Sequence, residues 1–327
     1  MSERRGVVLV LPGQGTQRAG MGTGLYAALP AFAERVDHVL GHWGAAGAEI
    51  RADWLADSPA LGIDDIRRAQ PLLFAIDWAL GDYLLAHGTA PVALVGHSVG
   101  ELAASVLAGV LDLADATALM TDRLVRLADA PPGAMLAVAA RPEEVAFCTG
   151  AGVDIGAINA PRQVVLAGSL PDIERAAARL AAAGISARPA RSPVAFHSAQ
   201  LEAHALRSVP AVRAIAFREP ALPLWSAYTG APLTAEQVRT PEFWARQPAA
   251  PVLFWPTLTA ALDHVGPALV VEAGPGRSLS TAARRHPALV SGASAAVALL
   301  PHAAGDPDQD LRAFKEALAL IRAGSRV

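Results

Sequence analysis

The stretch "GHSVGE", residues 96–101, places a serine where its hydroxyl could act as a nucleophile. It fits the pattern G-x-S-x-G, in which a sharp turn from strand to helix exposes the serine oxygen, and the following backbone N–H can help to bind an oxyanion. The apolar run "PVALV" precedes the turn and "ELAASVLAGVL" follows it, as a strand and a helix should. Ser98 and Glu101 also fit a helix-capping box, which is the alternative to catalysis.

A nucleophilic serine needs a base, and three histidines are candidates. His97 adjoins the serine but should point elsewhere on the turn, His197 lies in the loop "SPVAFHSAQL", and His302 lies late in the chain. An oxyanion could be bound by the loop "LPGQGTQ", residues 11–17, where two glycines permit a tight turn and Gln14 offers a backbone N–H. Read alone, this loop could also simply end a strand.

These residues require a framework of strands and helices. Apolar runs such as "GVVLVLPG" and "PVALVGHS" are typical of strands buried on both faces, and helical patterns such as "QPLLFAIDWALGDYLLAHG" alternate with them. The alternation predicts an α/β domain with a parallel sheet. From Gly133 to Ser192 the expected order is β-α-β-β-α-β, the ferredoxin-like arrangement. We predict a large domain of residues 1–129 and 194–327, with a ferredoxin-like subdomain inserted at 130–193.

Composition narrows the classes of function. The 327 residues are 53% apolar and 17% charged, as in a globular protein. The net charge of −3, with no block of basic residues, argues against nucleic acid as a partner. A single cysteine, Cys148, excludes an internal disulfide and a cysteine-based metal site. No apolar stretch is long enough to span a membrane and the N-terminal run is too short for a signal peptide, so a cytoplasmic protein is expected.

Six motifs follow one another along the chain: "LPGQGTQ", "QPLLFAI", "GHSVGE", "INAPRQVVLAG", "VAFHS" and "VEAGPG". In this order they resemble the malonyl-CoA:acyl-carrier-protein transacylase family, which includes the discrete enzymes of fatty-acid synthesis and the acyltransferase domains of modular polyketide synthases. The resemblance covers nearly the whole chain. It implies an α/β hydrolase-like large domain, a cleft between that domain and the subdomain, and no metal or redox cofactor.

The resemblance also assigns catalytic roles. Ser98 matches the nucleophile that forms the acyl-enzyme, and His197 matches its base. Gln14 and Val99 match the positions whose backbone N–H groups form the oxyanion hole. A main-chain carbonyl usually orients the base in this family, and Gln247 is the candidate for that position.

Other residues match the substrate pocket. Arg123 matches the arginine that holds the malonyl carboxylate, a task suited to a guanidinium because it is always charged and can bind a carboxylate through two hydrogen bonds. Arg126, one turn further, could be confused with it. The four residues ending at the base read "VAFH", against "HAFH" in malonyl-selective and "YASH" in methylmalonyl-selective polyketide acyltransferases. The expected pocket residues are Arg123, His97, Asn159, Val194 and Phe196.

The implied reaction is a double displacement. Ser98 takes an acyl group, malonyl by preference, from CoA and passes it to the phosphopantetheine thiol of an acyl carrier protein. A monomer is expected. Because carrier proteins are acidic, the cleft should have a basic rim. Its candidates are Arg188, Arg191, Arg277, Arg284 and Arg285.

Three different functions compete with this interpretation. One is transfer of an acyl group without a free carboxylate between carrier proteins, which Arg123 argues against. Another is a serine hydrolase or editing thioesterase that uses His302 with Asp306 or Asp308, although both acids follow the histidine, the wrong order for that fold. The third is a docking protein without catalysis, against which the intact catalytic residues argue.

Overall fold

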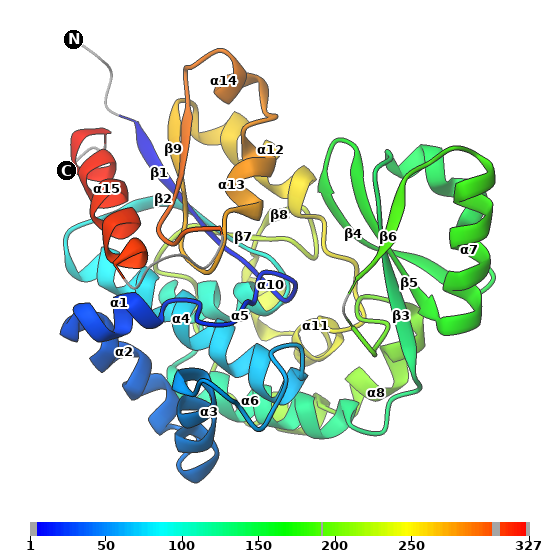
Figure 1. Ribbon diagram of the computed structural model, residues 1–327, viewed down its shortest axis with the longest axis horizontal. Helices are drawn as coiled ribbons and strands as arrows, with labels where there is room; N and C mark the ends of the chain where they lie inside the picture. The colour runs from blue at the N-terminus through cyan, green and yellow to red at the C-terminus, as the bar shows by residue number, and fades with distance from the viewer. Residues whose placement is uncertain (1–4, 191, 303–307, 325–327) are drawn as a thin grey trace.

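The computed structural model describes residues 5–190, 192–302 and 308–324, which form a large lobe and a smaller one (Figure 1). The large lobe contains a six-stranded sheet in the order β10-β9-β1-β2-β7-β8. Its strands are β1 (Gly6–Leu11), β2 (Pro91–Gly96), β7 (Leu224–Ser226), β8 (Ala231–Pro232), β9 (Ala268–Glu272) and β10 (Ala295–Ala298). All neighbouring strands are parallel except the edge pair β7 and β8. The predicted parallel sheet is confirmed.

Helices cover both faces of this sheet because its strands are apolar on both. Along β1, Leu9 and Leu11 join one core, whereas Val8 and Val10 join another. The first core includes residues of α1 (Thr23–Ala28), α2 (Pro30–Gly41), α3 (Ala45–Leu55), α4 (Ile66–Ala86), α5 (Val99–Leu107), α6 (Leu113–Leu127) and α15 (Gln309–Gly324). The second includes residues of α12 (Phe254–Val265) and α13 (Ser278–Ala283). The remaining helices of this lobe are η2 (Ala199–Leu201), α8 (Glu202–Leu206), α9 (Val209–Arg213), α10 (Ala235–Arg239), α11 (Pro241–Arg246) and α14 (Pro287–Val290).

The small lobe has its own antiparallel sheet, in the order β4-β5-β3-β6. Its elements are β3 (Gly133–Val138), η1 (Pro142–Cys148), β4 (Val153–Ala160), β5 (Gln163–Ser169), α7 (Leu170–Ala182) and β6 (Ala187–Pro189). This is the expected ferredoxin-like order, except that the first helix is a 3₁₀ helix, which suits a seven-residue segment that buries only Val145 and Cys148. The α/β class with a second subdomain is therefore confirmed, while the proposed boundaries at 129/130 and 193/194 stay a prediction.

The two lobes meet beside the carboxyl ends of the large sheet's parallel strands. Strand β4 of the small lobe pairs with the segment that precedes α12: the Ile158 N–H donates to the Val252 carbonyl and the Val252 N–H to the Gly156 carbonyl, each at 2.9 Å. Among the described helices, none is long and apolar enough to cross a membrane. Ligands of open α/β sheets bind at this edge of the sheet, so a functional site is expected there.

Candidate active site

Ser98 lies in the sharp turn between β2 and α5, with a φ angle of 54° that residues other than glycine rarely adopt. The backbone packs so closely around this turn that the two flanking glycines leave no room for a side chain. A Cβ atom on Gly96 would lie 2.1 Å from the Cα of Glu101, and one on Gly100 would lie 2.3 Å from the Leu11 carbonyl oxygen. The two glycines of G-x-S-x-G are therefore required by close backbone contacts.

The capping role for Ser98 is not supported. Ser98 is the N-cap residue of α5, but its side chain forms no capping hydrogen bond there. Its Oγ instead lies 2.8 Å from Nε2 of His197. Glu101 does not complete a capping box either, because its carboxylate accepts hydrogen bonds from the Ser226 hydroxyl at 2.6 Å and the Ala227 N–H at 2.7 Å.

His197 is held through both ring nitrogens. Its Nδ1 lies 2.8 Å from the Ala250 carbonyl oxygen. Because a carbonyl only accepts, Nδ1 carries the hydrogen and Nε2 is left with a lone pair that faces the Ser98 hydroxyl. Burial lowers the pKa of His197 to about 4, although the hydrogen bond to Ala250 opposes this shift. The imidazole is therefore neutral at pH 7 and able to accept the serine proton.

The sequence-based choice of Gln247 as the residue that orients this histidine is wrong by three positions. After α11 the chain makes one further turn, in which the Ala250 N–H donates to the Arg246 carbonyl, before Val252 pairs with β4. The carbonyl that reaches Nδ1 therefore belongs to Ala250, and the Gln247 backbone contributes only a smaller upward effect on the pKa of His197.

The loop after β1 packs directly on the Ser98 turn. A Cβ on Gly13 would lie 2.3 Å from the His97 carbonyl oxygen, so this close approach requires glycine. The adjacent Gln14 accepts a hydrogen bond from Gln70 of α4 through its side-chain oxygen, at 3.2 Å. Val99 is the first residue of α5, where backbone N–H groups have no acceptor within the helix. Both residues predicted for an oxyanion hole thus lie on segments that meet at Ser98.

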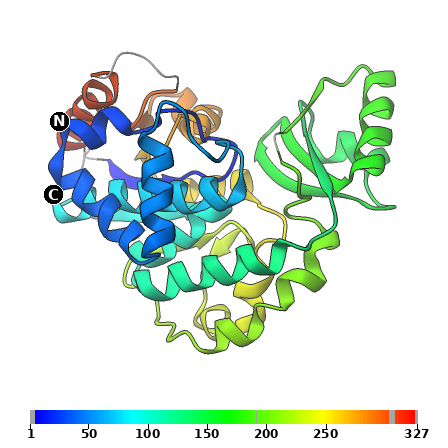
Figure 2. The same ribbon diagram turned by 60° about the horizontal axis from the view of Figure 1, so that its bottom comes forward.

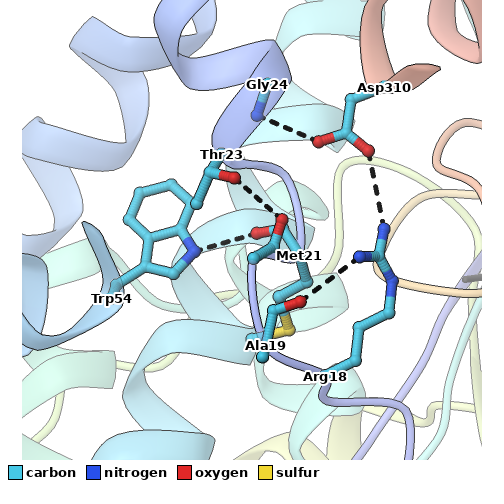
Figure 3. Close-up of polar contacts among 8 residues, drawn as sticks. Arg18, Ala19, Met21, Thr23, Gly24, Trp54 and Asp310 are labelled. Atoms are coloured by element: carbon cyan, nitrogen blue, oxygen red, sulfur yellow. Dashed lines mark hydrogen bonds and ion pairs between the residues drawn. The ribbon is translucent and has the colours of Figure 1, made fainter. Parts of the chain in front are cut away.

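The C-terminal helix fastens the continuation of this loop (Figure 3). The Asp310 carboxylate of α15 accepts hydrogen bonds from the Arg18 guanidinium at 3.5 Å and from the Gly24 N–H of α1 at 3.1 Å. The Trp54 indole donates to the Met21 carbonyl at 2.9 Å. Residues near the two ends of the chain therefore hold the loop that carries Gln14.

Arg123 of α6 is 9% exposed and carries its charge among neutral oxygens. Its Nη2 donates to the Trp244 carbonyl and to Oε1 of Gln247, each at 2.7 Å, while its buried Nε finds no partner among the described residues. Burial lowers the pKa of Arg123, while Glu101 and Asp122 oppose the shift without a direct salt bridge to it among the described residues. Arg126, the other arginine considered from the sequence, pairs instead with Asp122 one turn earlier.

A narrow cavity joins these groups. It is lined by Gln70, Ser98, Val99, Leu102, Met120, Arg123, Leu127, Phe196, His197, Tyr228 and Pro248. Of the residues predicted for catalysis or substrate binding, Ser98, Val99, Arg123, Phe196 and His197 therefore share one cavity. Its walls combine polar and apolar side chains, and its charged lining residue is Arg123, so an anionic group entering it would find its counter-charge there.

The other predicted pocket residues lie around the cavity. His97 points away from Ser98, as expected: its Nε2 lies 2.8 Å from Oδ1 of Asn159 on β4, and burial lowers its pKa. This contact links the Ser98 turn to the small lobe. Val194 packs with Phe196 in a small apolar cluster, so it supports the cavity wall without lining it.

Sequence reasoning missed Tyr228, assigned no role to Gln70, and considered Glu101 only as part of a capping box. Tyr228 lies in the turn between the short strands β7 and β8, and nothing in its neighbourhood in the sequence marks it as part of a site. Gln70 belongs to the quoted motif "QPLLFAI", which was a usable signal. Burial raises the pKa of the Glu101 carboxyl to about 8, although its hydrogen bonds with Ser226 and Ala227 oppose the shift.

The predicted basic rim and the rival base His302 lie further out. Arg188, Arg277, Arg284 and Arg285 are exposed, although Arg284 donates to the Ala296 carbonyl at 2.7 Å. Arg191 and Asp306 lie outside the described residues. His302 is exposed and does not line the cavity that contains Ser98. Over the described ranges, no group of three or more His, Cys, Asp and Glu side chains is placed to hold a metal ion.

The sequence profile of a family described as "Acyl transferase domain" matches residues 8–324. The chain belongs to this acyltransferase family. It is 36% identical over 282 residues to one of the subunits of the phenolphthiocerol/phthiocerol polyketide synthase of Mycobacterium tuberculosis, covering 86% of this chain and 19% of the relative. It is 38% identical over 293 residues to polyketide synthase GfsA of Streptomyces halstedii, covering 84% of this chain and 4% of the relative. The acyltransferase thus spans about a fifth or less of these relatives.

Two solved structures have the same fold as this chain. The acyl transferase domain of SpnD, in complex with 2-(pent-4-yn-1-yl)malonyl, is 30% identical with a TM-score of 0.90, over 99% of this chain and 78% of that one. FabD from Acinetobacter baumannii is 24% identical with a TM-score of 0.85, over 98% of this chain and all of that one. The acyltransferase therefore shares its large α/β domain and small subdomain with the SpnD domain and with FabD.

Proposed function

We propose that this acyltransferase moves a malonyl group from CoA to the phosphopantetheine thiol of an acyl carrier protein, through an ester on Ser98. The observation that carries the proposal is the placement of the hydrogen-bonded Ser98–His197 pair and the buried Arg123 guanidinium in one cavity. The pair supplies a nucleophile and a neutral base, and the guanidinium supplies a site for a carboxylate.

In the first half-reaction, the Ser98 oxygen attacks the thioester carbonyl while its proton passes to Nε2 of His197. The backbone N–H groups of Gln14 and Val99 stabilise the oxyanion that develops on the carbonyl oxygen. The C–S bond then breaks, the imidazolium returns the proton to the departing sulfur, and CoA leaves. The Ala250 carbonyl keeps the ring oriented throughout, because it accepts the Nδ1 hydrogen in both protonation states.

In the second half-reaction, the carrier's phosphopantetheine thiol gives its proton to His197 and attacks the malonyl-serine ester. The C–O bond to Ser98 breaks and the serine oxygen recovers the proton. The same base and the same oxyanion donors serve both halves, so no metal, redox group or further acid is required.

Arg123 supports a substrate with a free carboxylate. Its Nη2 is bound by neutral oxygens and, within the described residues, no carboxylate pairs with it directly, although Glu101 and Asp122 act on its charge from further away. A buried charge without a counter-charge is costly, and a malonyl carboxylate in the cavity would relieve that cost. This favours malonyl over an acyl group without a carboxylate.

A hydrolase and a docking protein receive less support. A hydrolase using His302 would need that exposed residue at Ser98, where His197 already lies. A docking protein without catalysis would have no need for a strained serine bonded to a buried neutral histidine. The polyketide synthase relatives suggest that the acceptor is a polyketide carrier, and we propose that class of partner for this chain.

Intact-protein mass spectrometry tests the proposal. The chain is incubated separately with malonyl-CoA, methylmalonyl-CoA and acetyl-CoA, and the adduct is located by peptide mapping. We expect a malonyl adduct on Ser98 that disappears when carrier protein bearing phosphopantetheine is added and reappears on the carrier. Loading of acetyl but not malonyl, or release of free acid at the same rate without carrier, would overturn the proposal.

A further inference from the structure

Tyr228 is an aromatic residue of the cavity for which the reaction outlined above has no role. It lies in the turn between β7 and β8 and lines the cavity together with Ser98, Arg123 and Phe196. The ring centroids of Tyr228 and His197 are 6.2 Å apart, and those of Phe196 and His197 are 6.3 Å apart. Two aromatic side chains therefore flank the imidazole within the space that must admit an acyl group.

The backbone that carries Tyr228 is held firmly. Glu101, on the helix that begins at Ser98, accepts from the Ser226 hydroxyl and the Ala227 N–H. The Ala227 carbonyl accepts from the Leu253 N–H at 2.6 Å, and the Tyr228 N–H donates to the Ser226 hydroxyl at 3.2 Å. The turn is thus bonded to α5 on one side and to the segment before α12 on the other, so the backbone from which the tyrosine ring extends into the cavity is fixed.

Two points of a bound malonyl group are fixed by the cavity. Its thioester carbonyl must lie at Ser98 and its free carboxylate at Arg123. The α-carbon joins these groups, so any substituent on it must occupy the space between the remaining lining side chains. Apart from His197, the aromatic members of that lining are Phe196 and Tyr228.

We propose that Tyr228 is a specificity-determining residue, which together with Phe196 excludes malonyl units that carry a substituent on the α-carbon. The inference rests on the proposed function, since it presupposes an acyl group between Ser98 and Arg123. The fold by itself does not impose the exclusion, because the SpnD domain of the same fold was solved with a substituted malonyl group. Side chains of the cavity must therefore set the limit.

The bulk of the ring, not its hydroxyl, carries this role. Burial raises the pKa of Tyr228 and the nearby Glu101 adds to the shift, whereas Arg123 and the Ser98 hydroxyl oppose it. The phenol is therefore neutral and adds no charge that could repel a substrate. Replacement by phenylalanine should keep the exclusion, while replacement by a smaller aliphatic residue should relax it.

A competition experiment separates these effects. Equimolar malonyl-CoA and methylmalonyl-CoA are offered to the wild-type chain and to the variants Y228V, Y228L and Y228F, and the ratio of the two Ser98 adducts is measured by mass spectrometry. We expect Y228V and Y228L to raise the share of methylmalonyl by at least about 10-fold, the lower bound for accommodating one extra carbon. Y228F should keep the wild-type ratio.

Trp225→Leu is the matched control, because Trp225 lies on β7, three residues before Tyr228, but lines a groove away from Ser98. Melting temperatures establish whether each variant is folded. If Y228V does not fold, the adduct ratio of Y228L tests the inference in its place. An unchanged ratio in a folded small variant that still loads malonyl, or an equal change in W225L, would overturn the inference and leave the proposed function standing. A wild-type chain that loads no malonyl would overturn the proposed function and the inference with it.

Discussion

The Ser98–His197 pair is oriented by a carbonyl group, and its pH dependence follows from this arrangement. The Ala250 oxygen cannot take a proton, so the base depends on the imidazole alone. Burial lowers the pKa of His197 to about 4, and only the neutral ring can accept the serine proton.

We therefore predict that acyl loading varies little with pH between about pH 6 and about pH 8, where an exposed histidine would titrate. Rapid-quench mass spectrometry of the Ser98 adduct across this range is the measurement. Ser98→Ala should abolish loading, and His197→Ala should slow it by at least about 10²-fold. A loading rate that halves near pH 6.5 would contradict the buried neutral histidine.

The second prediction at this scale concerns the carboxylate site. Arg123→Ala should lower kcat/KM for malonyl-CoA by about 10²-fold, which corresponds to the few kcal/mol lost when one partner of a buried charge pair is truncated. Loading of acetyl should be kept or increased, because a neutral acyl group gains nothing from the guanidinium. Arg126→Ala is the matched control, since Arg126 pairs with Asp122 outside the cavity. Equal losses of malonyl and acetyl loading would indicate a structural role for Arg123.

At the scale of elements, the sequence allowed most of the site to be located. The apolar runs before Gly96 and Pro12 predicted strands buried on both faces, and because parallel strands end at one sheet edge, their loops had to meet. Ser98 was found from the G-x-S-x-G pattern between such a strand and a helix, and the Gln14 loop from its two glycines after another strand, while the family resemblance assigned Val99. Sequence patterns predict a site residue well when that residue directly follows a buried strand long enough to be recognised.

Tyr228 and Ala250 could not be found by the same reasoning. Tyr228 follows a strand of three residues, too short for a hydrophobic pattern to reveal. Ala250 contributes a carbonyl, which every residue has, and its position depends on one extra turn after α11. Tertiary contacts alone decide which backbone group faces the site here. The family resemblance therefore pointed to Gln247, three residues away.

Helix α4 carries a buried acid that should make stability depend on pH. Both carboxylate oxygens of Asp77 are buried without a hydrogen-bond partner among the described residues, and Oδ1 would lie 2.3 Å from a Cβ on Gly274. Burial, with the nearby Glu272 carboxylate adding to it, raises the pKa of Asp77 well above its ordinary value. The folded chain therefore keeps a proton that the unfolded chain has lost, and stability must fall as pH rises toward the folded pKa.

We predict that Asp77→Asn removes this part of the dependence. The free energy of unfolding is measured with urea at about pH 5 and about pH 8. The difference between variant and wild type should shift in favour of the variant as pH rises, by up to about 1.4 kcal/mol per pH unit. Asp82→Asn, on the same helix and paired with Arg35 at the surface, is the control. An equal difference between Asp77→Asn and wild type at both pH values would mean that Asp77 is ionised in the folded chain.

For the whole molecule, the small lobe lies beside the large one (Figure 2), and both lobes contribute residues to the site. The large lobe provides Ser98, Arg123 and His197, whereas β4 of the small lobe reaches His97 through Asn159 and holds the segment of Ala250 through Val252. Under the proposed function, a carrier protein would deliver its phosphopantetheine thiol between them. Exposed arginines on both lobes, Arg188 on β6 and Arg277 at the start of α13, are therefore candidates for contact with an acidic carrier.

The last prediction concerns this docking. Arg277 follows the strand end Glu272, and the adjoining Gly276 lies against Thr16 in the loop that carries Gln14, so Arg277 belongs to the cleft side of the large lobe. Reversing its charge with Arg277→Glu should raise KM for the carrier several-fold while loading from malonyl-CoA stays unchanged, because the carrier takes part only in the second half-reaction. The transfer step should also become less sensitive to salt, since screening weakens attraction between exposed charges.

Arg51→Glu, the same reversal on the exposed helix α3, is the matched control and should leave both half-reactions unchanged. Steady-state transfer at two salt concentrations, paired with rapid-quench loading of Ser98, distinguishes docking from damage to the site. If Arg277→Glu and Arg188→Glu both left the carrier KM and its salt dependence at wild-type values, the carrier would have to approach by another face. Slower loading in either variant would instead indicate that the substitution disturbs the Gln14 loop or the small lobe.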